Sequence, residues 1–249
     1  MSRTAICKAT ILRSRASGES NRELSLLTTE QGVVKATVFG GPKSKLRAYA
    51  SPYNSGRVWL YFNPVKGSVK VNDFDVLLWR PGLRELYERT IAAGAVADTI
   101  LASHGGGGSW ETAVTLADTA LDALECANEE FCGRVLIHFL WQWAGFLGIR
   151  PAMEYCADCG EAAFEDAPLW FDAREGNVMC DSCASLRRNE INLLLVNPGC
   201  RRWFSAITPL EPSQAGRYSM DGKSFHEAKA LATAVLSAAL EKRLASWDW

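Results

Sequence analysis

The sequence predicts an α+β protein with a small β-barrel at residues 1–80 and a helical domain at residues 81–249, into which a four-cysteine ribbon is inserted at about residues 150–188. Three observations support this fold class. Short apolar runs alternate over the first 80 residues, apolar residues then recur at helical spacing, and two Cys-x-x-Cys pairs interrupt the helical part. The chain has 249 residues, 48% of them hydrophobic, which is enough to bury a core in each part.

The first 80 residues contain five or six predicted strands separated by turn residues such as Ser17–Asn21 and Glu30–Gly32. The strands are predicted at residues 5–15, 24–28, 33–39, 57–62 and 74–79, with two further alternating positions at Val69 and Val71. So many short strands in so few residues are typical of a closed barrel or sandwich. A five-stranded oligonucleotide-binding barrel (OB-fold) is the natural candidate, because it combines closure with a basic face.

From Pro81 onward the apolar period becomes helical. Helices are predicted at residues 83–101, 110–124, 131–147, 189–196 and 224–244, with a loop at 211–221. We expect Ser224 to cap the final helix and Glu227 to complete a capping box. The helix at 131–147 is apolar nearly all round, but it is too short and too often interrupted by polar residues to span a bilayer.

The polar residues of that apolar helix, Arg134, His138 and Gln142, are spaced at i, i+4 and i+8 and therefore share one face. One interpretation is that this face is the exposed edge of a mostly buried helix. The other is that it forms the polar rim of an apolar groove that accepts an anionic peptide.

Four cysteines, Cys156, Cys159, Cys180 and Cys183, form two Cys-x-x-Cys pairs separated by twenty residues. Each pair supplies two thiolates from one tight turn, which is the pattern of a tetrahedral zinc ribbon. Two disulfides, or four unrelated buried cysteines, are the alternatives. Because four thiolates leave no open coordination position, we expect one structural zinc ion.

Charge is distributed unevenly along the chain. Residues 1–80 contain 13 Lys or Arg against 5 Asp or Glu, and residues 81–249 contain 14 against 23. A basic first part predicts contact with a polyanion, the alternative being that these cations merely solvate a small β-domain. The first residues lack the apolar run of a signal peptide, and the four other cysteines are scattered, which predicts a reducing cytoplasm.

Seven cations are the candidate nucleic-acid contacts, since four lie on or beside the predicted strands and three in the loop GGPKSKLR, with aromatic residues between them. They are Arg13, Arg15, Arg22, Lys35, Lys43, Lys45 and Arg47. No catalytic motif accompanies them: the Gly105–Gly108 run lacks a following Lys-Ser/Thr, and the three histidines are isolated. We therefore expect a protein that is not an enzyme.

These residues resemble the RecO family of recombination mediators. The resemblance is carried by Gly-Glu-x-Asn-Arg-x-Leu (Gly18 to Leu24), the following Leu-Leu-Thr, and the Gly-Gly loop with Ser44 to Arg47. The stretch LGIRPAMEYCADCG (Leu147–Gly160) also resembles this family's entry into its zinc module. The order of barrel, helices, cysteine pairs and final helix matches as well.

The resemblance implies a DNA repair and recombination protein that binds single- and double-stranded DNA and anneals complementary strands. It implies RecR, and in some lineages RecF, as partners that help RecA displace the single-stranded-DNA-binding protein (the RecFOR pathway). It also implies that the seven cations contact DNA, that the four cysteines ligate zinc, and that the protein acts at the nucleoid in a bacterial cytoplasm. Arg134, His138 and Gln142 are then candidates for docking the acidic, Phe-ended tail of the single-stranded-DNA-binding protein.

Two other functions compete with this interpretation. A zinc-ribbon interaction module in RNA metabolism or transcription would read its ligand with the ribbon, but the segment between the cysteine pairs is acidic. A metal-dependent hydrolase would need an open metal position and a nearby base. The sequence leaves open whether Arg187, Arg188, Arg201 and Arg202 form a second DNA surface.

Overall fold

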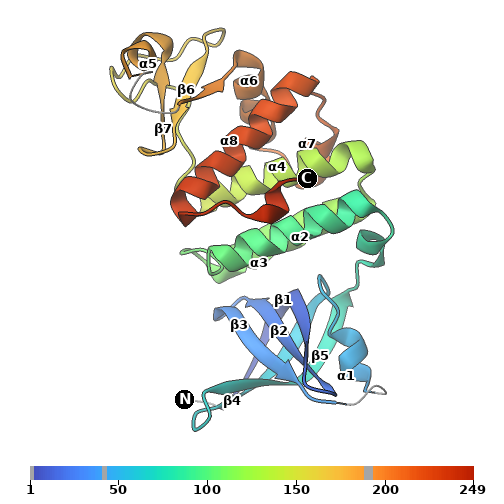
Figure 1. Ribbon diagram of the computed structural model, residues 1–249. Coiled ribbons are helices and arrows are strands. Elements are labelled where there is room, and N and C mark those ends of the chain that lie inside the picture. The colour runs from blue at the N-terminus through green and yellow to red at the C-terminus, as the bar shows by residue number, and fades with distance from the viewer. Residues whose placement is uncertain (1–2, 41–43, 188–192) are drawn as a thin grey trace. The chain divides into compact units, whose positions relative to one another are not determined.

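A computed structural model describes residues 3–40, 44–187 and 193–249. It divides the chain into two compact units, Met1–Cys126 and Ala127–Trp249 (Figure 1). The first unit therefore contains the barrel together with the first two long helices, and the second contains the remaining helices and the cysteine ribbon.

The first unit is built on a closed five-stranded barrel with the order β1-β2-β3-β5-β4, which confirms the predicted OB-like barrel. Its strands are β1 (Thr4–Ser17), β2 (Asn21–Thr28), β3 (Gly32–Val38), β4 (Ser55–Asn63) and β5 (Ser68–Leu78), with the short helix α1 (Lys45–Tyr49) between β3 and β4. Alternate residues such as Ile11, Leu26, Ala36 and Leu60 fill the interior. The period-2 pattern of the sequence thus reports the two faces of the barrel wall.

The predicted run at 74–79 and the two isolated valines belong to one strand, β5. Its inward residues Val71 and Phe74 are three positions apart, because the pairing with β4 shifts register between Trp59 and Leu60. That irregularity breaks the alternation in the middle of the strand, which is why the sequence pattern divides it in two.

Two helices, α2 (Tyr87–Ala102) and α3 (Trp110–Cys126), pack side by side against β1 of the same unit, and α3 also packs against β2. A 3₁₀ turn, Pro81–Arg84, leads into them from the barrel. The side chain of Arg80, just before this turn, is buried and joins barrel and helices. It donates hydrogen bonds to the carbonyl of Tyr53 (2.7 Å), Ser55 Oγ (2.7 Å) and Asp118 Oδ1 (3.1 Å).

The second unit is centred on α4 (Glu129–Phe146), which packs against α7 (Pro212–Arg217) and α8 (Gly222–Leu240). Helix α6 (Pro198–Ile207) also packs on α8, and the turn Ala245–Trp247 ends the unit. Phe204 of α6 stacks on Trp141 of α4, with ring centroids 4.1 Å apart.

The ribbon is inserted between α4 and α6 of the second unit. It contains a three-stranded sheet in the order β7-β6-β8, formed by β6 (Leu169–Asp172), β7 (Asn177–Cys180) and β8 (Leu193–Val196), together with the short helix α5 (Asp181–Arg187). The segment between the two cysteine pairs therefore forms an antiparallel hairpin, β6 and β7.

Three local predictions about the second unit are wrong. The segment 189–196 was predicted to be a helix, but its described part is the strand β8. A uniformly apolar run fits both the helical and the strand period, and pairing with β6 makes this one a strand. The predicted loop at 211–221 contains α7, which Pro212 starts at its first position. The final helix is capped by Asp221, which accepts the N–H of Ser224 (2.9 Å), so Ser224 lies inside the helix.

Among the described residues, no helix combines the length and the apolar character that crossing a membrane requires. This agrees with the rejection of residues 131–147 as a membrane span.

Candidate metal centre and nucleic-acid interface

The first cysteine pair lies in a tight turn that the backbone closes on itself. The N–H of Cys156 donates to the carbonyl of Glu161 (2.9 Å), and the N–H of Gly160 donates back to the carbonyl of Cys156 (3.0 Å). Gly160 has a positive φ of 73°, a conformation that costs glycine little. The turn brings Cys156 and Cys159 to the same side of the ribbon.

The second pair begins at the end of β7 and finishes in α5. Cys180 is the last residue of the strand and Cys183 lies in the first turn of the helix. The N–H of Cys180 points at the sulfur of Cys156 (3.3 Å), and the N–H of Cys183 points at the sulfur of Cys180 (3.5 Å). The N–H of Ala157 also donates to the carbonyl of Val178 in β7 (2.9 Å), so the first knuckle is held against the strand that ends in the second pair.

The four sulfur atoms lie within 4.8 Å of one another, with Cys159 Sγ and Cys180 Sγ 4.0 Å apart. A tetrahedral site with Zn–S bonds of about 2.3 Å places its sulfurs about 3.8 Å apart, so the donor set fits such an ion closely. None of Cys156, Cys159, Cys180 and Cys183 is in a disulfide, so neither of the two disulfides considered from the sequence is formed. The cluster is therefore able to hold a metal ion.

The electrostatics of the cluster also suit a cation. Burial opposes ionisation of Cys156, but N–H groups of Cys159, Cys180 and Asp158 lower the pKa of this thiol to about 6. Hydrogen bonding to Cys180, which favours the protonated thiol, raises the pKa of Cys183, and the charge of Cys156 raises it further. A positive ion among the sulfurs removes that conflict, since thiolates are the form that binds metal.

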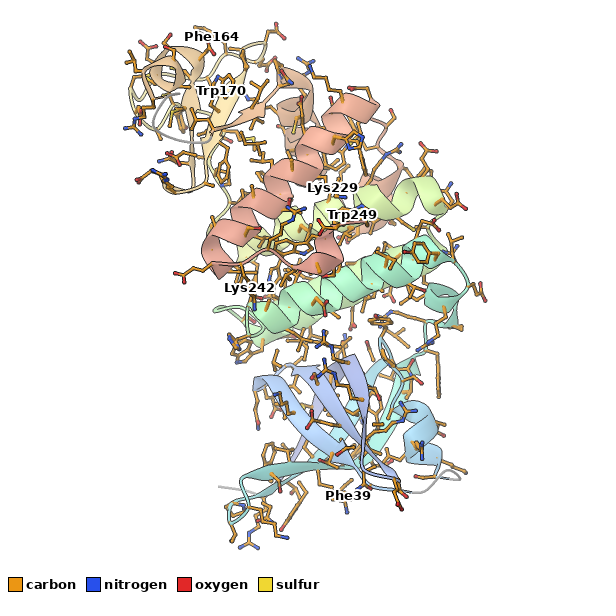
Figure 2. The ribbon with its side chains drawn as sticks, in the orientation of Figure 1. Phe39, Phe164, Trp170, Lys229, Lys242 and Trp249 are labelled. Carbon is orange, nitrogen blue, oxygen red and sulfur yellow. The ribbon has the colours of Figure 1, made fainter. Side chains whose placement is uncertain are left out.

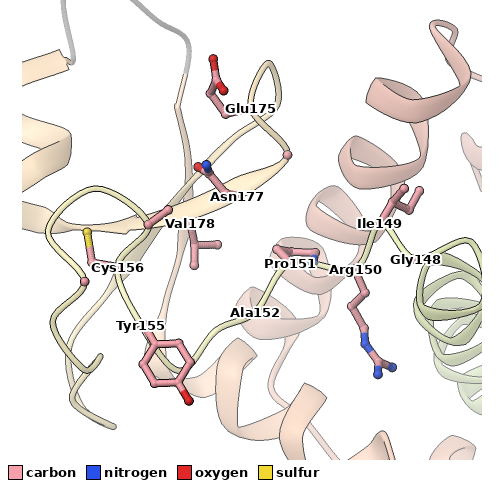
Figure 3. Close-up of a pocket in the computed structure, with 13 residues that line it drawn as sticks. Gly148, Ile149, Arg150, Pro151, Ala152, Tyr155, Cys156, Glu175, Asn177 and Val178 are labelled. Atoms are coloured by element: carbon pink, nitrogen blue, oxygen red, sulfur yellow. The ribbon is translucent and has the colours of Figure 1, made fainter.

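A hollow of about 690 Å³ adjoins the first cysteine pair (Figure 3). It lies between the Gly148–Ala152 segment, the first knuckle and the turn before β7, and Cys156 is part of its lining. Its charged side chains, Arg150 and Glu175, lie at opposite ends and point away from each other (Figure 3). The hollow therefore lacks the convergent acid and base groups that define a catalytic pocket.

The predicted DNA-contacting cations fall into two groups. Arg15, Lys35 and Lys45 are exposed, the first two on the outer wall of the barrel and the third on α1. Arg13 is partly buried and pairs with Asp98 of α2, and Arg22 donates to Ser14 Oγ (3.1 Å). Arg47 is half-buried on α1. Lys43 lies outside the described residues.

Cross-strand register arranges the outer wall in rows. Arg13, Ser25 and Lys35 are opposite one another across β1, β2 and β3. The next row contains Arg15, Glu23 and Thr37, and Thr37 pairs with Lys70 of β5. Lys70 therefore extends the basic wall. It was missed from the sequence, although its alternation with the valines at 69 and 71 indicates a different face from Val71.

The polar stripe of α4 is not an exposed edge, so that interpretation is wrong. Arg134 and His138 are only 7% and 2% exposed. Arg134 pairs with Glu130 and donates to the carbonyl of Gly216 (3.3 Å), and Gln142 donates to the carbonyl of Thr208 (2.6 Å). These side chains hold α4 to the chain around α6 and α7, and their role in docking a peptide stays a prediction.

Burial of His138 makes the second unit acid-sensitive. Desolvation lowers the pKa of this imidazole to about 4, although carbonyls of Leu210 and Ile207 oppose the shift. The folded state thus prefers neutral histidine, so stability is complete above the unfolded pKa of about 6.5 and is lost as the pH falls toward 4. We expect protonation of His138 in the unfolded chain to lower the free energy of unfolding by about 2 kcal/mol at pH 5 relative to pH 8. Urea unfolding of His138→Gln should show a smaller pH dependence by that amount, and an unchanged dependence would contradict the assignment.

The described arginines considered for a second DNA surface make contacts within the second unit, although Arg202 is exposed. Arg201 donates to the carbonyls of Phe164 (2.7 Å), Ala167 (2.8 Å) and Met153 (3.1 Å), and so ties the start of the ribbon to α6. Arg202 pairs with Asp166 (3.1 Å) and Arg187 pairs with Asp158 (3.4 Å). Arg188 lies outside the described residues.

Two family models match nearly the whole chain. "Recombination protein O N terminal" matches residues 1–77, and "Recombination protein O C terminal" matches residues 84–248. Proteins named DNA repair protein RecO are similar over most of their length. That of Pelotomaculum thermopropionicum is 26% identical over 245 residues, covering 96% of this chain and 90% of the relative. That of Heliobacterium modesticaldum is 24% identical over 254 residues (97% and 87%), and that of Bacillus subtilis is 24% identical over 180 residues (71% and 68%).

Proposed function

This chain belongs to the RecO family of DNA repair proteins, and on that premise we propose that it binds single- and double-stranded DNA and anneals complementary strands. We further propose that it acts with RecR, and in some settings RecF, to help load RecA onto DNA coated by the single-stranded-DNA-binding protein. Its place of action is then the bacterial nucleoid.

The observation that supports DNA binding most directly is the exposed basic wall of the barrel. Arg15 projects from β1 and Lys35 from β3, with β2 between them, Lys70 extends the wall from β5, and Lys45 lies on α1. Among the residues that the structure describes, none of these four cations is in an ion pair with a carboxylate. Each is therefore available to a phosphate, and each phosphate contact releases counterions.

Annealing follows from the same charge. Two complementary strands repel one another through their phosphates, and a cationic surface that binds the backbones reduces this repulsion while the bases stay free to pair. No covalent bond is made or broken in that process. We therefore propose a mediator that is not an enzyme.

We propose zinc as the metal of the cysteine cluster, in a structural role. Four thiolates satisfy a tetrahedral ion completely and leave no position for a water or a substrate. Bound there, zinc supplies cross-links between the first knuckle, β7 and α5. The ribbon is unlike a nucleic-acid-binding ribbon, because the segment between its cysteine pairs is acidic. It contains one basic residue, Arg174, and five acidic residues, Glu161, Glu165, Asp166, Asp172 and Glu175.

The function is tested by replacing Arg15, Lys35 and Lys45 together with alanine. We expect annealing of complementary oligonucleotides to slow at least tenfold, because three phosphate contacts are lost. The slope of log affinity against log salt should decrease by about 2 for single strands. Annealing is measured with bare strands and with one strand coated by the single-stranded-DNA-binding protein, at two salt concentrations.

A matched control removes the same charge from the other unit. Arg217, Lys223 and Lys242 are all exposed, and their triple alanine variant should anneal DNA as the wild type does. Equal loss in both variants would show a non-specific charge effect. A wild-type protein without salt-dependent DNA binding would refute the proposed function.

A further inference from the structure

Phe39 and Trp79 are exposed aromatic side chains beside the barrel strands, and Trp79 already packs edge-on against Tyr49. Phe39 follows β3 and is 51% exposed, whereas Tyr49 and Phe62 pack partly against the barrel core. It lies at the end of the barrel remote from α2 and α3 of the same unit (Figure 2). The helices that cover β1 and β2 therefore leave this end of the wall open.

Phe39 shares its face with the basic wall. Lys35 and Thr37 are alternate positions along β3, and Phe39 continues the alternation one residue past its end, while Ala36 and Val38 between them are buried. Alternate residues of a strand point the same way and advance about 3.3 Å per residue, so about 13 Å separates Lys35 from Phe39. A cation and an aromatic ring thus occupy one outer edge.

A second cation reaches the ring from a strand distant in sequence. Thr37 pairs with Lys70 of β5, and Lys70 Nζ lies 5.7 Å from the centroid of the Phe39 ring. This cation–π distance holds an ammonium group beside the ring. Together these two groups suit one nucleotide, because the ammonium can contact its phosphate and the exposed ring can stack on its base.

Resting on the proposed DNA binding, we propose that Phe39 stacks on an unpaired base while Lys70 and Lys35 contact the phosphates beside it. The ligand class is single-stranded nucleic acid. A base inside a duplex is already stacked and offers no free face, so the ring contributes to single-strand binding alone. The cations, in contrast, serve both kinds of DNA.

The test compares Phe39→Leu, which keeps apolar bulk without a π face, with Phe39→Tyr, which keeps the face. We expect Phe39→Leu to weaken binding of an oligothymidylate about tenfold, with an unchanged salt slope, an unchanged affinity for duplex and an unchanged melting temperature. Phe39→Tyr should bind as the wild type does. Lys70→Ala should instead decrease the salt slope by about 0.7 for single strands.

Tyr87→Leu is the matched control, because Tyr87 is a 74% exposed aromatic residue at the start of α2 in the same unit. It should leave both affinities unchanged. A Phe39→Leu protein that binds oligothymidylate normally, or that loses single-strand and duplex affinity equally, would overturn the stacking role; the first result would assign the ring to a protein contact. Failure of the wild type to bind any DNA would instead refute the proposed function itself.

Discussion

Replacing Cys156 and Cys180 with serine is expected to abolish metal binding and unfold the ribbon, while the barrel unit stays folded. One thiolate is lost from each knuckle, and two sulfurs cannot satisfy a tetrahedral ion. The apolar cluster around the cysteines is small: Cys156, Met179 and Ala184 are its buried members, with Trp170 and Leu193 packed partly against them. A core of this size does not hold a fold without its metal, whose binding contributes on the order of 10 kcal/mol in structural zinc sites.

The measurements are metal content per chain and the rate of proteolysis between residues 154 and 187. We expect about one zinc ion per wild-type chain, none in the double variant, and rapid cleavage of the variant in the ribbon alone. Cys126→Ser is the control, because Cys126 is exposed and lies outside the cluster. A double variant that retains metal, or a wild type that holds none after refolding with zinc, would contradict the assignment.

The second large effect is expected on stability, from the buried ion network between Arg80 and α3. Arg80, only 2% exposed, donates to Asp122 Oδ1 (2.6 Å) as well as to Tyr53, Ser55 and Asp118. Asp118 also accepts from Thr10 Oγ1 (2.7 Å) and pairs with Lys8 (2.8 Å). Removing one partner leaves a buried carboxylate under-compensated, so Arg80→Met should lower the unfolding free energy of the barrel unit by about 3 kcal/mol.

Urea unfolding followed by intrinsic fluorescence gives that value. Arg84→Met is the control: Arg84 is an exposed arginine four residues away that donates to the carbonyl of Pro52 (2.9 Å). It should change stability by less than about 0.5 kcal/mol. A loss below 1 kcal/mol in Arg80→Met would show that Lys8 alone is sufficient to compensate Asp118.

The barrel and the cysteine cluster were predictable from the sequence for local reasons. Alternation reports a wall with one buried face, and two Cys-x-x-Cys pairs with a hairpin between them have few ways to arrange four sulfurs. The predictions failed for segments whose structure depends on contacts with residues distant in the sequence. Leu193–Val196 is a strand because β6 is beside it, and the structural role of Arg80 depends on α3, some forty residues later.

The same reasoning separates the candidate DNA contacts. The sequence gives no reason to treat Arg13 and Lys35 differently, because both are cations on strands with alternating apolar and polar positions. Only the packing of α2 commits Arg13 to Asp98 and leaves Lys35 exposed. Lys70 joins the group because β5 runs parallel to β3 at this point, a pairing between residues more than thirty positions apart.

That pairing has a thermodynamic consequence. Over their described residues, β3 and β5 meet at a single position, Thr37 with Lys70, whereas the other neighbours pair along most of their length. This seam is then the part of the barrel wall that opens at the lowest free energy, and its amide hydrogens should exchange fastest. Phe39 and Lys70 lie on either side of it, so a strand bound across both residues bridges the seam. By mass action, such a ligand favours the closed barrel and slows hydrogen exchange along β3 and β5.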